Sequence, residues 1–367
     1  MPATVAPTEA RAAASSSAGP PAPLLAVARE SLLVEEIHRL AAAAGIEVEF
    51  VTDLATVLRR WNAASAVLVG ADLAGDLVPL GLRRRPGVHL LAWGGVPDHL
   101  FRTAVALGAE DVSEMPRAAA WLGEVIADLD DRCAAPARTL GVVGGSGGAG
   151  ATTFACALAQ RAARSGPTLL IDADPLGPGL DRMLGIERRE GVRWGELGRT
   201  SGRLSARSLR EAVPRRGELG VLTWAARSAA PLQPFAVREV MAAAVRGHRT
   251  VVVDLPRAGG PVAEELLARC DAVVLVVVPS LVGVASAARW CAEVADRSRL
   301  RVVVRGSGVS APEVARALRL PVAATMGDQR GLAEAIDIGE GPVRSWRGPL
   351  GRAAREVAER LIVLGTP

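Results

Sequence analysis

Short apolar runs alternate with amphipathic stretches along most of the chain from residue 24 onward. Aliphatic runs bounded by turn residues indicate buried strands, and apolar positions spaced three or four residues apart indicate helices. Ser31 stands where a helix cap is expected, and Pro116 suits a first helical turn. In the first part of the chain the pattern predicts strands at 24–28, 46–51, 66–69, 88–92 and 110–112, and helices at 31–44, 54–61, 99–107 and 116–131.

The same alternation continues after residue 139. Strands and helices that alternate in this way form parallel sheets covered by helices on both faces, so the sequence predicts two α/β domains. The final helix is expected to pack on the core, with a lipid anchor as the alternative. The predicted strands are 140–143, 168–171, 219–223, 250–253, 272–278, 301–304 and 322–324, and the predicted helices are 152–165, 234–246, 262–268, 283–295, 311–318 and 348–364.

The expected domain boundaries follow from composition. Residues 1–23 are rich in Pro, Ala and Ser and are expected to be a disordered leader, because they carry too little apolar surface to fold. The first domain is expected over 24–132, a linker over 133–138 and the second domain over 139–367. A chain of 367 residues is long enough for two hydrophobic cores.

No targeting or membrane segment is expected. The longest apolar run, 272–278, has the length of a strand and ends at Pro279, well short of the roughly 20 residues of a membrane-spanning helix. The chain starts without the apolar core of a signal peptide, so a cytoplasmic location is expected. Cys133, Cys156, Cys270 and Cys291 lack the paired spacing of a zinc site or a disulfide framework.

Positive charge is concentrated in one segment. All 43 basic residues are arginine, and the formal net charge of the chain is +4. Residues 182–216 contain ten arginines and four glutamates, which gives this segment a charge of +6. Two interpretations remain open: a solvated helical face, or a surface for anionic lipid, nucleic acid or an acidic partner.

A glycine-rich loop follows the strand at 140–143. The sequence from Leu140 to Thr153 is LGVVGGSGGAGATT, and an expected helix begins directly after the glycines. Backbone amides of such a loop can converge on an anion, and the positive end of the helix dipole lies at the same place. Gly145, Gly150 and Thr152 fit the phosphate-loop spacing G-x-x-x-x-G-K-[ST], but Ala151 occupies the lysine position.

Three carboxylates stand where predicted strands end. Asp172 and Asp174 follow the strand at 168–171, and Asp254 follows the strand at 250–253. Ligands of open α/β sheets bind at the carboxyl ends of the strands, which is the edge that carries the glycine loop. Asp254 and the Thr152 hydroxyl are therefore candidate Mg²⁺ ligands. Asp174 is a candidate to orient an attacking water molecule, and Asp172 is grouped with it as a catalytic candidate.

On these motifs the chain from about 139 to 361 resembles the MinD/ParA group of dimerising P-loop ATPases. Residues 146–153 read SGGAGATT where that group has K-G-G-x-G-K-T-T, and the stretches 172–174 and 254–260 resemble its two switches. The resemblance implies ATP and Mg²⁺ as cofactors. The residues it places around the nucleotide are Gly145, Ser146, Gly147, Gly148, Ala149, Gly150, Ala151, Thr152 and Thr153, and Arg257 is added as a hypothetical replacement for the missing lysine.

The first domain resembles a response-regulator receiver, a flavodoxin-like fold. The strand at 24–28 is followed by Arg29 and Glu30, which supply one carboxylate where receivers have an acidic cluster, and Asp72 lies just past the third strand. Without a lysine in the chain, an aspartyl phosphate would lack its usual counter-cation. The domain is therefore expected to be a pseudo-receiver that docks a partner.

Together the two resemblances point to the CpaE/TadZ branch of the MinD/ParA group. That branch implies a homodimer that positions division or pilus-secretion machinery, with a peripheral place at the membrane, septum or cell pole. Ala151 and Ser146 remove two lysine charges, so we expect ATP binding with weak or lost hydrolysis. Two alternatives remain open: an active ATPase that cycles on membrane or nucleoid, and a nucleotide-free interaction scaffold.

Overall fold

The computed structural model describes residues 24–130, 137–197, 204–225 and 232–363. The chain divides into two compact units, Met1–Asp130 and Asp131–Pro367, which are described separately below. The expected leader and most of the expected linker lie outside the described residues. Within the described ranges, no helix combines the length and the apolar character that crossing a membrane requires.

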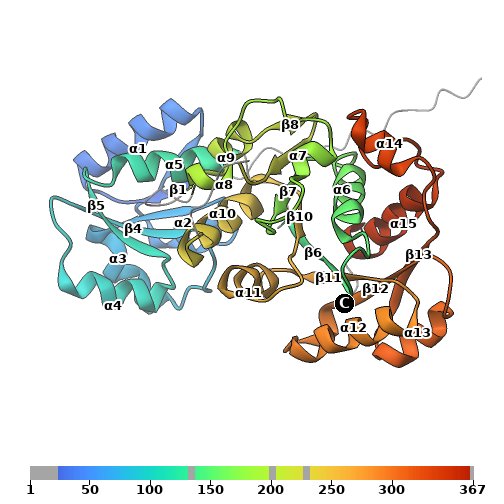
Figure 1. Cartoon of the computed structure of the whole chain (residues 1–367). Coiled ribbons are helices and arrows are strands. Elements are labelled where there is room, and N and C mark those ends of the chain that lie inside the picture. The colour runs from blue at the N-terminus through green and yellow to red at the C-terminus, as the bar shows by residue number, and fades with distance from the viewer. Residues whose placement is uncertain (1–23, 131–136, 198–203, 226–231, 364–367) are drawn as a thin grey trace, which may run out of the picture. The chain divides into compact units, whose positions relative to one another are not determined.

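The first unit is a five-stranded parallel sheet in the order β2-β1-β3-β4-β5. This is the doubly wound order of flavodoxin-like proteins, and the expected fold class is confirmed for this unit. Apolar side chains from both faces of the sheet form two cores under the helices. The elements are β1 Leu24–Val27, α1 Ser31–Ala44, β2 Val48–Phe50, α2 Leu54–Arg60, β3 Val67–Gly70, α3 Ala71–Leu77, η1 Val78–Leu80, β4 Val88–Trp93, α4 Asp98–Leu107, β5 Asp111–Met115 and α5 Ala119–Asp130 (Figure 1).

Two local predictions for this unit are wrong. The cap of α1 is Glu30 and not Ser31, and the Glu30 side chain makes no capping hydrogen bond. The last helix begins at Ala119, so Pro116 precedes it and does not form its first turn. Helix α3 was not expected, because its seven residues include Gly75 and offer little helical periodicity.

The second unit is an eight-stranded sheet in the order β13-β12-β11-β6-β10-β7-β9-β8. All neighbouring pairs are parallel except β8 and β9, which are antiparallel. The strands read as continuous aliphatic runs because both faces of the sheet are covered. They are β6 Arg138–Gly144, β7 Thr168–Asp172, β8 Arg215–Arg216, β9 Leu219–Leu222, β10 Thr250–Asp254, β11 Ala272–Val277, β12 Leu300–Arg305 and β13 Val322–Met326.

Helices cover both faces of this sheet. Side chains of α6, α7 and α15 form one core with the sheet, and those of α8 to α13 form the other. The layered arrangement confirms the expected α/β class. The helices are α6 Ala151–Ala162, α7 Leu180–Met183, α8 Trp194–Leu197, α9 Ala206–Ala212, α10 Pro234–Gly247, α11 Pro261–Ala268, α12 Leu281–Glu293, η2 Arg297–Arg299, α13 Ala311–Leu318, α14 Leu332–Asp337 and α15 Pro349–Ala358, followed by a π-helical turn at Glu359–Val363.

The last helix is part of the core. Leu350, Ala354, Val357 and Leu361 are at most 5% exposed and pack in the same cluster as α6. This arrangement bears out core packing over the lipid-anchor alternative for the described part of the helix. Strand β6 begins at Arg138, one residue inside the segment expected as a linker.

Candidate functional site

The glycine loop joins β6 to α6 at the carboxyl edge of the sheet. The Gly145 amide donates to the Val276 carbonyl of β11, and the Phe154 amide donates to the Gly150 carbonyl at the start of α6. Gly148 and Gly150 have φ angles of +73° and +88°, a region that disfavours side chains with a β-carbon. The loop therefore needs glycine at these two positions to turn from strand to helix.

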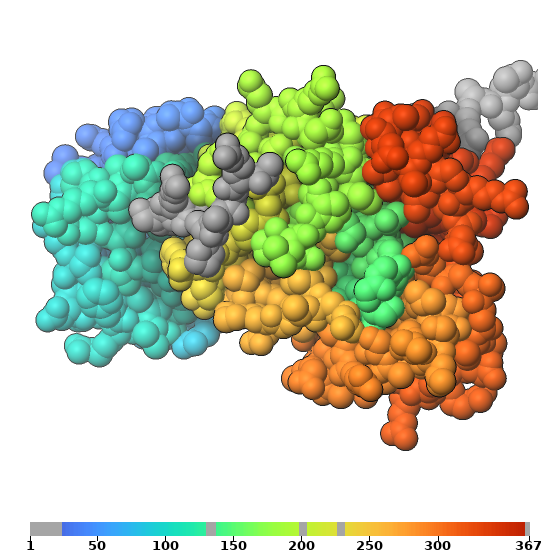
Figure 2. All heavy atoms as spheres, in the orientation of Figure 1, coloured from blue at the N-terminus to red at the C-terminus, as the bar shows by residue number. Residues whose placement is uncertain are grey.

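The loop has an open side. A β-carbon built on Gly147 or Gly148 meets no atom within 4 Å. In the described part of the chain, the amides of Gly147, Gly148 and Gly150 have no hydrogen-bond partner. Figure 2 shows that the green part of the chain, which contains the start of α6, reaches the molecular surface on the face shown. Unpaired amides above open space, at the positive end of a twelve-residue helix, form an anion-binding arrangement.

Thr152 and Asp254 lie together below this loop. Asp254 is the last residue of β10 and pairs in register with Val142 of β6 and Asp172 of β7. Burial raises the pKa of the Asp254 carboxyl to about 7, and an interaction with Thr152 opposes this rise. A hydroxyl and a carboxylate are hard oxygen ligands of the kind that Mg²⁺ takes along with water and phosphate oxygens, so the residues present fit this ion.

No protein-only metal site accompanies them. Among the described residues, no group of three or more His, Cys, Asp or Glu side chains is arranged to hold a metal ion. In nucleotide-binding proteins Mg²⁺ is commonly held by one or two carboxylates together with substrate phosphates.

Asp172 and Asp174 organise the loop that follows β7. Asp172 accepts hydrogen bonds from the Thr223 hydroxyl at 2.7 Å and from the Asp174 amide at 3.2 Å. Asp174 in turn accepts the Leu176 amide at 3.0 Å. Burial raises the pKa of Asp172 to about 6, while the Thr223 contact opposes this effect. Both carboxylates shape the loop at 172–179, and their catalytic roles stay predictions.

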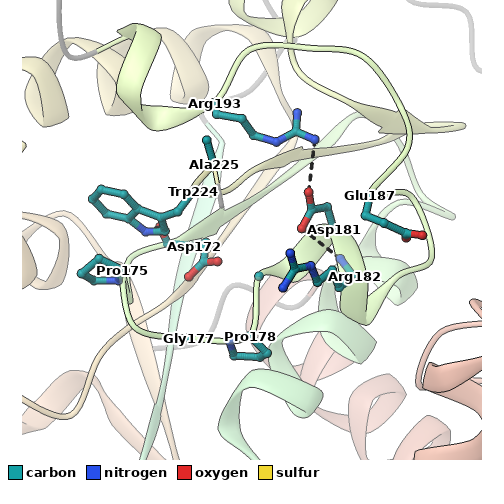
Figure 3. Close-up of a pocket in the computed structure, with 11 residues that line it drawn as sticks. Asp172, Pro175, Gly177, Pro178, Asp181, Arg182, Glu187, Arg193, Trp224 and Ala225 are labelled. Carbon is teal, nitrogen blue, oxygen red and sulfur yellow. Dashed lines mark hydrogen bonds and ion pairs between the residues drawn. The ribbon is translucent and has the colours of Figure 1, made fainter. Parts of the chain in front are cut away.

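A pocket of about 500 Å³ lies beside this loop, on the side of β9. Figure 3 shows the Asp172 carboxylate and the Trp224 ring on one side of it and Arg182, Asp181 and Arg193 on the other. Arg193 and Asp181 form an ion pair at 3.1 Å, with both side chains 12% exposed. The pocket therefore has a fixed charged wall facing the loop.

Two tryptophans hold the backbone of the same loop. The indole N–H groups of Trp194 and Trp224 donate to the Asp172 carbonyl at 2.7 and 3.1 Å. Their rings lie 6.2 Å apart between centroids. The sequence did not predict Trp194, Trp224 or Thr223 at this site, because they come from distant segments and carry no motif.

Arg257 and Arg305 differ in their relation to the glycine loop. Arg257 is exposed and donates to the Ser286 hydroxyl of α12 at 2.7 Å, and its proposed role at the phosphates stays a prediction. Arg305, which sequence analysis did not select, donates to the Gly148 carbonyl of the glycine loop at 3.0 Å. A signal for Arg305 existed: it directly follows an apolar strand, as Asp254 does.

Part of the basic segment serves the unit itself. Arg207 pairs with Glu211 at 3.0 Å, and Arg216 donates to the carbonyls of Leu184 and Glu340. Residues 198–203 of the segment lie outside the described part of the chain. Binding of lipid or nucleic acid by 182–216 stays a prediction.

The first unit uses Asp72 for its own structure. The Asp72 carboxylate, in the first turn of α3, accepts the backbone amides of Arg29 at 2.7 Å and Glu30 at 3.2 Å. Strand β3 ends at Gly70, where an added β-carbon would clash with the Asp72 carboxylate. Asp72 thus ties the end of β1 to the start of α3.

Known proteins match the folds of both units. A family model described as the Rv3660c-like, CheY-like N-terminal domain matches residues 27–137. The ParA family ATPase of Chlorobium tepidum TLS superposes with a TM-score of 0.55 at 19% identity, covering 62% of this chain and 98% of that one. The septum site-determining protein MinD of Pyrococcus horikoshii OT3, complexed with Mg-ADP, gives 0.53 at 17% identity and covers 62% and 97%.

The chain therefore combines a CheY-like N-terminal domain with a second unit that has the fold of the ParA and MinD structures. A chain of the MinC:MinD cell division protein complex of Aquifex aeolicus also superposes, with a TM-score of 0.52 at 21% identity over 63% of this chain and 97% of that one. The uncharacterized protein Rv3660c of Mycobacterium tuberculosis (strain ATCC 25618 / H37Rv) is 37% identical over 338 residues, 89% of this chain and 94% of the relative. The chain belongs to the family of Rv3660c.

Proposed function

We propose that this protein binds ATP and Mg²⁺ in the loop at 145–153 and acts as a nucleotide-dependent positioning protein. The observation that carries the proposal is the glycine loop between β6 and α6, open on one side, with Thr152 and Asp254 close to it. The MinD/ParA fold supports it, because this arrangement occupies the strand edge where α/β sheets bind ligands.

Each group at the site has a proposed task. The loop amides and the start of α6 bind the phosphates, and Thr152 and Asp254 hold Mg²⁺. When bound, Mg²⁺ neutralises charge on the phosphate oxygens. The bound metal also favours the ionised form of the Asp254 carboxyl, whose pKa burial otherwise raises. Asp174 and Asp172 set the conformation of the loop beside the phosphates, and Asp174 orients water.

Hydrolysis is proposed to be slow. Ala151 provides no charge at the position where the phosphate-loop pattern has lysine. Charge-assisted contacts to phosphate contribute about 1.5–3 kcal/mol each. Their loss weakens stabilisation of the transition state more than it weakens binding of ATP in the ground state. ATP occupancy, more than turnover, is then the state that partners detect.

The proposed role is spatial positioning in the manner of CpaE-like proteins. Solved relatives of the fold include the septum site-determining protein MinD and a MinC:MinD complex, which supports a dimer with protein partners. We propose a homodimer that acts in septum-site determination or places a Tad-type pilus or secretion machine. Its proposed place is the cytoplasm or the inner face of the membrane, with the first domain as docking module and residues 182–216 as a surface for lipid or DNA.

Equilibrium binding of ATP to the purified full chain, with and without Mg²⁺, tests the proposal. Tight Mg-dependent binding without hydrolysis, together with a nucleotide-dependent increase in mass by light scattering, supports a nucleotide-dependent positioning dimer. Hydrolysis above background supports an active ATPase instead. Absence of binding at millimolar Mg-ATP would sink the nucleotide function and leave an interaction scaffold.

A further inference from the structure

The glycine loop has a cationic neighbour that its own sequence does not supply. Arg305 is the last residue of β12, which lies two strands away from β6 in the sheet. The strand order brings the carboxyl end of β12 to the same edge as the loop. An arginine far away in sequence thus reaches the motif that lacks a lysine.

The Arg305 guanidinium is in direct contact with the loop. Its Nη1 atom donates to the Gly148 carbonyl at 3.0 Å and lies 2.8 Å from the position that a β-carbon on Gly150 would occupy. Its Nη2 atom lies 3.4 Å from a carboxylate oxygen of Asp328, whose side chain is 77% exposed. The guanidinium is therefore fixed against two of the glycines that shape the loop.

The contacts leave this group able to bind an anion. A guanidinium carries several N–H donors and remains charged at all physiological pH values, and the two contacts above use only part of that capacity. The Arg305 side chain is 32% exposed, so a solute can reach it. Because the side chain is already held in place, little conformational entropy is lost when it binds a ligand.

Resting on the function proposed above, we propose that Arg305 supplies from β12 the cationic phosphate contact that Ala151 cannot make. The ligand group is a phosphate of the bound nucleotide, and planar N–H pairs of arginine suit phosphate oxygens. Arg305 is a binding residue in this scheme, and Asp328 restrains it when the site is free.

Isothermal titration of the full chain with Mg-ATP and with tripolyphosphate tests this assignment. Arg305→Ala removes charge and loop contact, Arg305→Gln keeps a donor for the Gly148 carbonyl, and Arg305→Lys keeps the charge. Arg301→Ala is the matched control, because Arg301 lies on the same strand and hydrogen-bonds the Ser298 and Leu300 carbonyls at the opposite end.

The expected result is a graded loss. Arg305→Ala and Arg305→Gln lower the affinity for both ligands about tenfold or more. Arg305→Lys retains most of the affinity, and Arg301→Ala stays within about twofold of the parent. A decrease caused by loop disorder alone would spare Arg305→Gln and would thereby overturn the assignment.

Other outcomes separate this inference from the proposed function. If the parent chain binds neither ligand, the nucleotide function fails and the Arg305 assignment fails with it. If the parent binds Mg-ATP and Arg305→Ala binds it equally well, only the Arg305 assignment is wrong. A loss confined to ATP, with tripolyphosphate unaffected, places Arg305 at the nucleoside and also refutes the phosphate contact.

Discussion

Thr152 in the first turn of α6 interacts with the carboxyl of Asp254 at the end of β10, and this interaction opposes the rise in the Asp254 pKa that burial causes. The two residues are far apart in sequence, and the sequence predicts them together as magnesium ligands. Burial of this carboxyl links its ionisation both to folding and to metal binding.

The first prediction concerns pH. Burial raises the pKa of Asp254 to about 7, whereas the unfolded chain titrates near 4. The stabilising contribution of the neutral Asp254 carboxyl to the free energy of unfolding is therefore complete below about pH 4 and is lost as pH rises to about 7. Without Mg²⁺, Asp254→Asn should match the parent in Tm at pH 4 and exceed it at pH 8.

The difference at pH 8 should correspond to a few kcal/mol, at about 1.4 kcal/mol for each pKa unit. The same variant should lose the magnesium-dependent part of ATP affinity. Calorimetric melting across this pH range is the measurement, with the exposed Asp337→Asn as control. Equal Tm differences at both pH values would show that Asp254 does not titrate as described.

The second prediction restores the missing charge. Ala151→Lys places an ammonium group at the start of α6, in register with the phosphate-loop pattern. ATP affinity should rise about tenfold, and hydrolysis should become measurable by phosphate release. An Ala151→Met variant, of similar length without charge, controls for packing. Failure of lysine to exceed methionine would argue against a phosphate at this loop.

The third prediction separates two glycines of the loop. Gly150 has a φ of +88°, so Gly150→Ala should lower the stability of the free protein by about 1–2 kcal/mol. A β-carbon on Gly147 meets no atom within 4 Å, so Gly147→Ala should leave the stability almost unchanged.

Gly147→Ala should nevertheless weaken Mg-ATP binding, because its methyl group occupies the open side of the loop. Thermal unfolding without nucleotide and titration with Mg-ATP provide the two measurements. Full ATP affinity in Gly147→Ala would mean that the nucleotide does not lie on the open side.

The fourth prediction concerns the first unit. The Asp72 carboxylate accepts two backbone amides, so Asp72→Ala should lower the free energy of unfolding by about 1–3 kcal/mol. Asp76→Ala, an exposed change in the same helix, should have almost no effect. Urea unfolding of the full chain measures both variants.

Acetyl phosphate with Mg²⁺ should leave no phosphoryl group on Asp72. Detection of a stable phospho-aspartate by mass spectrometry would contradict the pseudo-receiver interpretation.

The sequence predicted those parts of the site that depend on local pattern. Asp172 and Asp254 each end an aliphatic strand, and the glycine spacing marks the loop, so a single segment was enough to find each of them. The alternating elements likewise gave the α/β class of both units. Short helices such as α7 and α14 were missed, because four to six residues show no helical period.

What depends on strand order could not be predicted. Arg305 contacts the loop only because β12 lies two strands from β6, and the sequence does not state that order. Asp72 was seen as a lone acid past a strand, whereas its partners are amides 42 and 43 residues earlier. In both cases the sequence shows the charged residue but does not show which backbone group it contacts.

The paired indoles on the Asp172 carbonyl give the protein an intrinsic optical reporter. Trp194 and Trp224 both donate to the backbone at the end of β7, where the loop with the candidate catalytic carboxylates begins. A rearrangement of that loop on binding of a triphosphate would alter the environment of both rings and hence their emission. Stopped-flow fluorescence of the unlabelled chain can therefore follow nucleotide binding without attaching a dye.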